Sequence, residues 1–287
     1  MLPIRSLLMC TANVERQVRS AVSGKADAVV FDLETTVLDS EKSAARAGIA
    51  RVLAGPSKPQ MFVRINEVDG PHVFDDLVDL VLPGLVGVMI PRAEDARQMQ
   101  IVDWALTRLE EKYGRSSAPV EILPLVETAK AVESLNSMLS ASPRIRRATF
   151  GVADYSLDTG IRVSSDEREL AYVRSRMVHA SRACGLEPPI DTVWLDFTDA
   201  DGMRVSMERS KREGFFGRLC IHPRQVELAN EVFTVSEEEL AAAHRIVAAF
   251  ATAKINKVAA INLDGRLVDA PIASNAERLI ARARRST

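Results

Sequence analysis

Most of the short apolar runs in this chain of 287 residues end at a charged or amide side chain. The residues in these positions are Asp32, Glu34, Arg64, Asn66, Arg92, Glu127, Asp154, Asp196, Asp199 and His222. Carboxylates that share one cavity repel one another and raise one another's pKa values unless a cation lies among them. Carboxylate oxygens without a cluster of Cys and His suit a hard cation, Mg²⁺ or Mn²⁺. If the fold brings these residues together, we expect them to hold a divalent metal.

Two arginines in this set supply fixed positive charge beside the expected metal. Arg64 and Arg92 suit a substrate carboxylate or phosphate. A metal ion and an arginine around an oxygen-rich anion can stabilise an enolate. The alternative interpretation is that each acidic residue caps a helix or forms an ion pair. For Asp199, which has the acidic neighbour Asp201, capping is the better interpretation.

Eight strand–helix units account for the positions of these residues. Short continuous apolar runs alternate with longer amphipathic stretches, as expected for parallel strands with both faces covered. Strands are expected at 6–10, 28–33, 61–65, 86–90, 120–126, 147–152, 193–197 and 218–221. Helices are expected at 14–23, 40–53, 73–80, 94–113, 128–139, 170–184, 202–213 and 224–232. This count predicts an α/β fold, a (β/α)₈ TIM barrel over residues 1–233, with its site at the carboxyl ends of the strands.

The alternative architecture is a doubly wound open sheet. Such a sheet normally carries a Gly-rich phosphate turn after its first strand, and none follows Cys10.

Residues 234–287 do not fit the barrel count and form a C-terminal extension. A helix is expected at 236–254, because Ser236 and Glu239 have the spacing of a capping box. Residues 258–269 suggest a hairpin with a turn at Asp264-Gly265. Pro271 is expected to open a last helix. The extension is predicted to be a packing arm or a lid.

Composition excludes several classes of protein. A net charge of −2 gives no reason to expect a nucleic-acid partner or a membrane anchor. No signal peptide and no apolar run of membrane-spanning length are recognisable, which favours the cytoplasm. The three cysteines lack CxxC spacing, so neither a disulfide framework nor a zinc site is expected. A thiol nucleophile at Cys220, two residues before His222, is an alternative to a buried inert cysteine.

Several short motifs, taken together, are typical of a known family. The sequence DAVVFDLE at 27–34 is followed by Lys42 and by Ala45-Arg46. Further motifs are Val63-Arg64-Ile65-Asn66, Pro91-Arg92, Val126-Glu127-Thr128-Ala129, Phe150-Gly151-Val152-Ala153-Asp154 and Ile221-His222-Pro223-Arg224-Gln225. With these motifs the chain resembles, over essentially its whole length, the citrate lyase β-subunit-like proteins of the HpcH/HpaI aldolase superfamily. That superfamily includes malyl-CoA and citramalyl-CoA lyases.

The resemblance implies roles for the residues of the expected metal site. Glu127 and Asp154 match the family's magnesium ligands, and the cofactor is therefore expected to be Mg²⁺, with Mn²⁺ as the alternative. Arg64 matches the arginine that grips the carboxylate of the keto-acid half. Glu34 matches an acid near the metal-bound waters, and Asp32 is expected to support it.

The resemblance also extends to substrate contacts and to the C-terminal extension. Arg92, where the family has lysine, and Asn66 are expected to contact the substrate. Residues 265–271 are similar to the lid motif of malyl-CoA-lyase-type members, in which an aspartate of one subunit reaches over the neighbouring site. Asp269 matches that aspartate, so the resemblance implies a catalytic role for it and a homotrimer or homohexamer. The replacements Thr11 and Thr35 leave the exact substrate open.

The expected reaction is Mg²⁺-dependent cleavage of a β-hydroxy acyl-CoA, of the malyl-CoA or citramalyl-CoA type, to a keto acid and an acyl-CoA. Three alternatives stay open: an acyl-CoA thioesterase on the same metal site, a CoA-independent aldolase, and a subunit of a citrate lyase complex. Arg16 and Arg19 are candidates for contacts with the phosphates of CoA.

Overall fold

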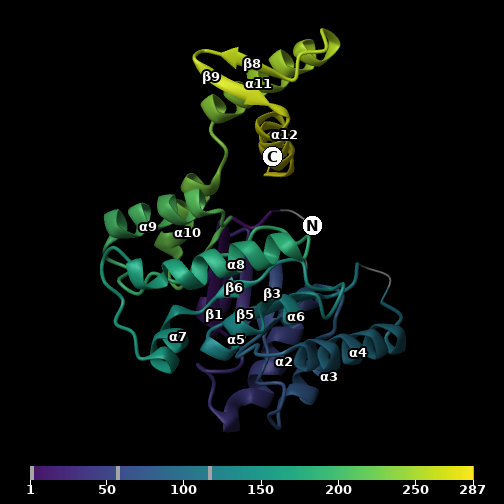
Figure 1. Ribbon diagram of the computed structural model, residues 1–287. Helices are drawn as coiled ribbons and strands as arrows, with labels where there is room; N and C mark the ends of the chain where they lie inside the picture. The colour runs from purple at the N-terminus through teal and green to yellow at the C-terminus, as the bar shows by residue number, and fades with distance from the viewer. Residues whose placement is uncertain (1–2, 56–58, 116–117, 287) are drawn as a thin grey trace. The chain divides into compact units, whose positions relative to one another are not determined.

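Seven parallel strands form the sheet at the centre of the larger part of the protein (Figure 1). The computed structural model describes residues 3–55, 59–115 and 118–286. The sheet order is β6-β5-β4-β3-β2-β1-β7. The strands are β1 (Ser6–Thr11), β2 (Ala28–Asp32), β3 (Gln60–Arg64), β4 (Leu85–Ile90), β5 (Glu121–Val126), β6 (Thr149–Phe150) and β7 (Arg218–Cys220). Their sequential parallel order is that of a TIM barrel, which confirms the predicted fold class.

Helices follow the strands and flank the sheet (Figure 1). They are α1 (Glu15–Val22), α2 (Lys42–Leu53), α3 (Val73–Leu80), α4 (Ala96–Lys112), α5 (Ala129–Glu133), α6 (Leu135–Leu139), α7 (Val152–Thr159), α8 (Ala171–Ala183), α9 (Ala200–Glu213) and α10 (Pro223–Phe233). The inside of the barrel is filled by apolar side chains from the strands, among them Leu7, Val30, Phe62 and Leu123. These side chains make the barrel a packed core whose open end is at the strand carboxyl ends.

The barrel closes between β6 and β7 through two residues that belong to no strand. Ile190 forms a parallel bridge with Thr149, and Asp191 forms one with Arg218. The prediction of a strand at 193–197 is therefore wrong by about three residues. Leu195 and Phe197, whose apolar side chains suggested that strand, are exposed. One of the two closing residues, Asp191, is charged, so a search for apolar runs does not find it.

Asp191 can occupy the interior because a compensating set of charges surrounds it. We call Glu167, Arg174, Asp191 and Arg218 the closing cluster; all four are buried. Asp191 Oδ2 lies 3.0 Å from Arg174 Nη2 and 2.7 Å from Arg218 Nη1. Glu167 accepts from both Arg174 Nη1 and Nη2 at 3.1 Å. Every charge of the cluster has an opposite charge in contact, which is the condition for burying charges.

Three other local predictions are corrected. The helix expected at 128–139 is two short helices, α5 and α6, which meet at Ser134. The strand expected at 147–152 is only β6, because Gly151 precedes a new helix, α7, that the pattern did not predict. Asp154 therefore lies in the first turn of a helix rather than in a loop.

The C-terminal segment Phe233–Thr287 forms the main part of a second compact unit, separate from the unit Ile4–Val232. It contains α11 (Glu237–Ile255), β8 (Ala260–Leu263), β9 (Arg266–Asp269) and α12 (Ala270–Ser286). The predicted capping box of Ser236 and Glu239 is confirmed. Asp264 and Gly265 both have positive φ, 53° and 80°, as a two-residue type I′ hairpin turn requires. Among the described residues, no helix is long and apolar enough to cross a membrane.

Candidate active site at the carboxyl ends of the strands

A cavity of about 360 Å³ opens at the carboxyl ends of the barrel strands. Polar and apolar residues line different parts of it. Its polar and thiol-bearing residues are Cys10, Thr11, Gln17, Asp32, Thr36, Arg64, Glu127 and Asp154. Its larger apolar residues are Met9, Met89, Leu125, Val152, Val193, Leu219 and Ile221. A mostly apolar cavity with a few converging charged groups is the usual form of a small-molecule site.

Four charged residues line this cavity, and a fifth, Glu34, lies beside one of them, Arg64. We call the five the mouth cluster: Asp32, Glu34, Arg64, Glu127 and Asp154. Arg64 ends β3 and donates from Nε and Nη2 to the two oxygens of Asp32, both at 2.7 Å. Its Nη1 lies 3.3 Å from Glu34 Oε2. Burial by itself would raise the pKa of Asp32, but the hydrogen bonds and charge of Arg64 outweigh burial and lower that pKa. Asp32 therefore stays ionised and fixes the guanidinium in one orientation.

Glu127 follows β5 and is held by the backbone of two neighbouring loops. It is 3% exposed, and its Oε1 accepts a hydrogen bond from the backbone N–H of Arg92 at 2.6 Å. Arg92 has a φ of 42°, an uncommon left-handed conformation for a residue other than glycine. A Cβ atom at Gly151 would lie 2.7 Å from Glu127 Oε2, which is closer than van der Waals contact allows. Any residue larger than glycine at this position would therefore displace the Glu127 carboxylate. Backbone strain at a functional position is consistent with a constrained site.

The electrostatics at Glu127 indicate that a cation fits there. Burial, and then the charges of Asp154 and Glu34, raise the pKa of Glu127 to about 8, against the lowering effects of the Arg92 N–H and the Arg64 charge. Within the described chain, no basic side chain is ion-paired with Glu127 or Asp154. A cation between these carboxylates would remove their repulsion.

The kind of cation follows from the available donors. Among the described residues, no set of three or more His, Cys, Asp or Glu side chains is arranged around one metal position. Glu127 and Asp154 can supply two carboxylate oxygens, which leaves the remaining positions to waters and substrate. That pattern, one or two carboxylates with several other oxygen ligands, suits Mg²⁺.

Asn66 lies behind the cavity rather than in its lining. Its side chain accepts from Lys42 Nζ at 2.5 Å and donates to Asp76 Oδ2 at 2.7 Å. The backbone N–H of Asn66 also donates to Asp76. Both the oxygen and the nitrogen of the amide thus take part in a buried polar network.

The Arg92 side chain, which was expected to contact the substrate, is not part of the cavity lining. It is 48% exposed, and its Nε lies 3.6 Å from Glu67 Oε1. In this arrangement it is the backbone of Arg92, through its N–H to Glu127, that takes part in the site.

The remaining polar residues at strand ends have local partners. Asp196 accepts from the backbone N–H of Thr198 in an exposed loop. Asp199 accepts from the Gly202 N–H and caps α9, which confirms the capping interpretation. His222 stacks on Phe197, with ring centroids 5.4 Å apart.

A thiol nucleophile has no support at either buried cysteine. Burial raises the pKa of both Cys10 and Cys220 to about 12, and the charge of Asp32 adds to the effect at Cys10. Both therefore stay protonated near neutral pH, and a protonated thiol is a poor nucleophile.

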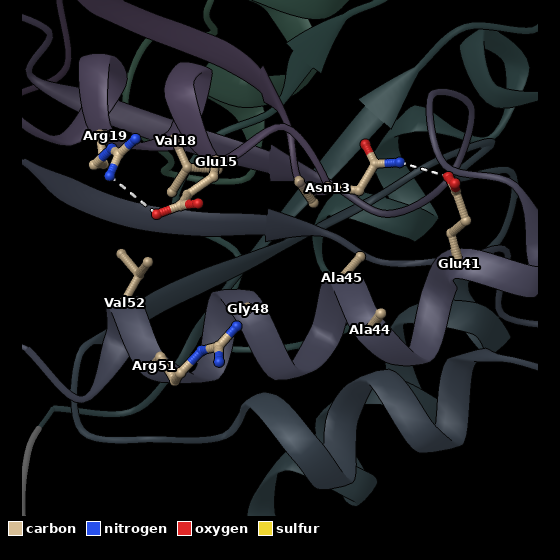
Figure 2. Close-up of a pocket in the computed structure, with 11 residues that line it drawn as sticks. Asn13, Glu15, Val18, Arg19, Glu41, Ala44, Ala45, Gly48, Arg51 and Val52 are labelled. Carbon is tan, nitrogen blue, oxygen red and sulfur yellow. Dashed lines mark hydrogen bonds and ion pairs between the residues drawn. The ribbon is translucent and has the colours of Figure 1, made fainter.

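A second cavity, about 650 Å³, lies between α1 and α2 on the outside of the barrel (Figure 2). Two polar pairs stand at its edges: Arg19 with Glu15 at 3.0 Å, and Asn13 with Glu41 at 2.6 Å. Arg51 also lines it and, among the described residues, has no ion-pair partner. Within residues 11–17, from the end of β1 into α1, Thr11 and Gln17 line the mouth cavity and Ala12, Asn13 and Glu15 line the second one, so the two cavities adjoin along this segment.

Asp269 belongs to the second compact unit, at the end of β9. It is half-buried, and its Oδ1 accepts a hydrogen bond from the backbone N–H of Ile272 at the start of α12. Its expected catalytic role stays a prediction.

Sequence reasoning did not identify several residues that shape the site. Gly151, Thr36 and Gln17 line the cavity, and the Arg92 backbone holds Glu127. Gly151 belongs to a motif that was recognised, but its role depends on a side chain from another strand. No sequence signal marks such a contact.

The chain was compared with known proteins. The family described as HpcH/HpaI aldolase/citrate lyase matches residues 5–223. The chain is 29% identical to citrate lyase subunit beta of Leuconostoc mesenteroides subsp. cremoris, over 96% of this chain and 92% of that protein. It is 32% identical to L-malyl-CoA/beta-methylmalyl-CoA lyase of Cereibacter sphaeroides, over 90% of this chain and 87% of that protein.

A solved structure is similar over nearly the whole length. CitE from Mycobacterium tuberculosis, in complex with magnesium, acetoacetate and coenzyme A, matches with a TM-score of 0.75 at 28% identity. The match covers 98% of each chain. The chain therefore belongs to the HpcH/HpaI aldolase/citrate lyase family and is a carbon–carbon lyase.

Proposed function

We propose that this protein is an Mg²⁺-dependent lyase that cleaves a β-hydroxy acyl-CoA, of the malyl-CoA or citramalyl-CoA type, into a keto acid and an acyl-CoA. The observation that carries the proposal is the mouth cluster, which gathers four carboxylates and one guanidinium at a cavity with an apolar wall. Relatives named as citrate lyase β-subunits and malyl-CoA lyases, and the CitE complex with magnesium and coenzyme A, support it.

The residues of the mouth cluster have distinct roles in this scheme. Glu127 and Asp154 would hold Mg²⁺, with Glu34 near its waters. The chemistry that Mg²⁺ supplies when bound is stabilisation of negative charge on substrate oxygens. Asp32 occupies Nε and one N–H of Nη2, and Glu34 lies beside Nη1. A guanidinium has five N–H groups, so Arg64 binds the substrate carboxylate through the N–H groups of Nη1 and Nη2 that these two acids leave free.

The proton transfers need groups beyond the mouth cluster. A base takes the hydroxyl proton, the hydroxyl oxygen becomes the carbonyl oxygen of the keto acid, and the carbon–carbon bond breaks, so that its electron pair leaves as a thioester enolate. Asp269 is our candidate for protonating the enolate carbon. Its carboxyl would need a raised pKa to act as an acid near neutral pH, which desolvation in a closed site could provide.

The cavity between α1 and α2 is the proposed place of the nucleotide end of CoA. It adjoins the mouth cavity through residues 11–17, and Arg51 offers a positive charge without a partner among the described residues. Of the two earlier candidates, Arg19 lines this cavity but is paired with Glu15, and Arg16 does not line it. We expect Arg51→Glu to raise the KM for the acyl-CoA by about tenfold, with Arg16→Glu as the matched control.

The test of the function is a cleavage screen with the purified chain, Mg²⁺ and several β-hydroxy acyl-CoAs, in which released keto acid is measured. Glu127→Ala and Asp154→Ala should each lower cleavage by at least about 10²–10³-fold. Both should also weaken Mn²⁺ binding, measured directly. Full activity of metal-free Glu127→Ala would contradict the proposal.

The same screen separates the proposed reaction from its alternatives. With malyl-CoA, glyoxylate as product supports a lyase, whereas free malate would show a thioesterase. Cleavage only of a hydroxy acid without CoA would show an aldolase of another kind. Activity only after addition of further subunits would show a component of a lyase complex.

A further inference from the structure

A lysine outside both cavities connects the two loops that carry the mouth cluster. Lys42 begins α2 and is 4% exposed. Its Nζ donates to the carbonyl oxygens of Leu33 at 2.8 Å and Glu34 at 3.2 Å, and to Asn66 Oδ1 at 2.5 Å. An ammonium has three N–H donors, so all three are used.

These contacts rule out a direct chemical role for Lys42. It does not line the mouth cavity, and its amine has no free position toward substrate. The one further polar contact of its amine among the described residues is a 3.7 Å ion pair with Asp39, whose side chain is 84% exposed, so that the pair contributes little.

The Lys42 contacts hold the segments that follow both partners of the Arg64–Asp32 pair, through backbone carbonyls after Asp32 and through the Asn66 side chain after Arg64. Leu33 and Glu34 directly follow Asp32, and the Glu34 N–H donates to Asp32 Oδ1 at 3.0 Å. Asn66 lies two residues after Arg64. The Leu33 N–H donates to the Arg64 carbonyl at 3.0 Å, so the two loops are also joined directly.

The far side of the network is anchored in the protein interior. Asp76 of α3 is fully buried and accepts from both the backbone and the side chain of Asn66. Arg46, one turn after Lys42 on α2, donates to Asp76 at 3.2 Å. Arg46 thus supports the same network but contacts neither Leu33 nor Glu34.

We propose that Lys42 is a positioning residue for the lyase reaction: by joining the loops after β2 and β3, it sets the orientation of Arg64 and Glu34 at the mouth of the barrel. Only the expected effect of Lys42 on catalysis rests on the proposed function. Its structural part, the orientation of Arg64, can be measured without any activity.

The experiment compares Lys42→Met with Arg46→Met. Both changes remove a buried cation from the same face of α2, where the side chains are 6% and 8% exposed. Lys42→Arg is a third variant, which keeps the charge, but its planar fork does not match three converging acceptors. The Arg64 Nε–H signal in ¹⁵N spectra is identified by its loss in Arg64→Lys.

In Lys42→Met and Lys42→Arg, we expect hydrogen exchange at Arg64 Nε–H to become at least about tenfold faster, and KM to rise about 10- to 100-fold with a smaller change in kcat. Arg46→Met should lower the thermal midpoint but leave both readouts unchanged. The inference is wrong if Lys42→Met and Arg46→Met lower the midpoint alike, with exchange and KM as in the wild type. If Lys42→Met does not fold, Lys42→Arg decides in the same way.

Failure of the proposed function gives a different result. A wild-type protein without lyase activity, but with an Arg64 signal that depends on Lys42 and not on Arg46, would contradict the function and keep the positioning role.

Discussion

The barrel contains two groups of charges, one buried throughout and one partly buried at the mouth, that are built in opposite ways. In the closing cluster, Arg174 and Arg218 face Glu167 and Asp191, and every contact is 3.2 Å or shorter. In the mouth cluster, Arg64 pairs with Asp32 and Glu34, and Glu127 and Asp154 have no cation in contact among the described residues. Two charges of each sign balance in the first group, whereas negative charge is in excess in the second.

The difference in charge balance indicates different roles for the two clusters. A balanced buried cluster can hold two segments together, as the closing cluster does at Asp191 and Arg218. An unbalanced cluster costs stability in the absence of a ligand, and it persists in proteins mainly where a ligand or a reaction uses the uncompensated charge. The excess of negative charge in the mouth cluster therefore indicates that this cluster binds a ligand.

The largest effect is expected from breaking the closing cluster. Asp191→Ala leaves Arg174 and Arg218 buried without this partner, so the free energy of unfolding should fall by about 3–5 kcal/mol. Urea denaturation followed by circular dichroism measures it. A loss below about 1 kcal/mol would show that the closing cluster does not hold the barrel together.

The next effect concerns the mouth cluster and its cation. Mg²⁺ at about 100 times its dissociation constant should stabilise the wild type by about 2.7 kcal/mol and should not stabilise Asp154→Asn. Without Mg²⁺, the variant should be as stable as the wild type or slightly more stable, because one repelling charge is gone. Denaturation with and without Mg²⁺ measures both quantities, and a large loss of stability in the metal-free variant would contradict the comparison.

The closing cluster should make the stability of the fold sensitive to acid. Burial by itself would raise the pKa of Asp191, but Arg174 and Arg218 outweigh it and lower that pKa below the ordinary 3.8. A lowered pKa stabilises the fold fully above the ordinary value, and this contribution is lost as the pH falls through the lower native value. The wild type should therefore lose stability steeply below about pH 4, whereas Asp191→Asn should lose less over the same interval. An equally steep loss in Asp191→Asn would assign the acid sensitivity to other groups.

The smallest effect is expected at Arg92. Because its φ of 42° is unfavourable for a residue with a Cβ atom, Arg92→Gly should relieve about 1 kcal/mol of strain, offset in part by the greater freedom of glycine when unfolded. The thermal midpoint should stay the same or rise slightly, and metal affinity should be kept because the backbone N–H remains. Arg92→Val is the control and should be less stable, since branching at Cβ is poorly tolerated at positive φ.

The sequence by itself determined the periodicity of the fold and the types of residue that gather at the mouth of the barrel. Continuous apolar runs such as the one before Asp32 predicted parallel strands with both faces covered, because burial of both faces is visible in the order of residue types. The residues of the mouth cluster were all named from their positions after these runs. Local signals were also sufficient for the Ser236 cap and the Asp264-Gly265 turn, since their hydrogen bonds and φ values involve neighbours in the chain.

Only the tertiary structure decided which charged residues are compensated. Asp191 looks in the sequence like any acidic residue, and its two arginines come from α8 and β7, distant along the chain. The same holds for the backbone N–H of Arg92 at Glu127 and for Lys42 between two loops. Electrostatic balance depends on distances between segments far apart in sequence, whereas patterns of residue types report only what each segment buries.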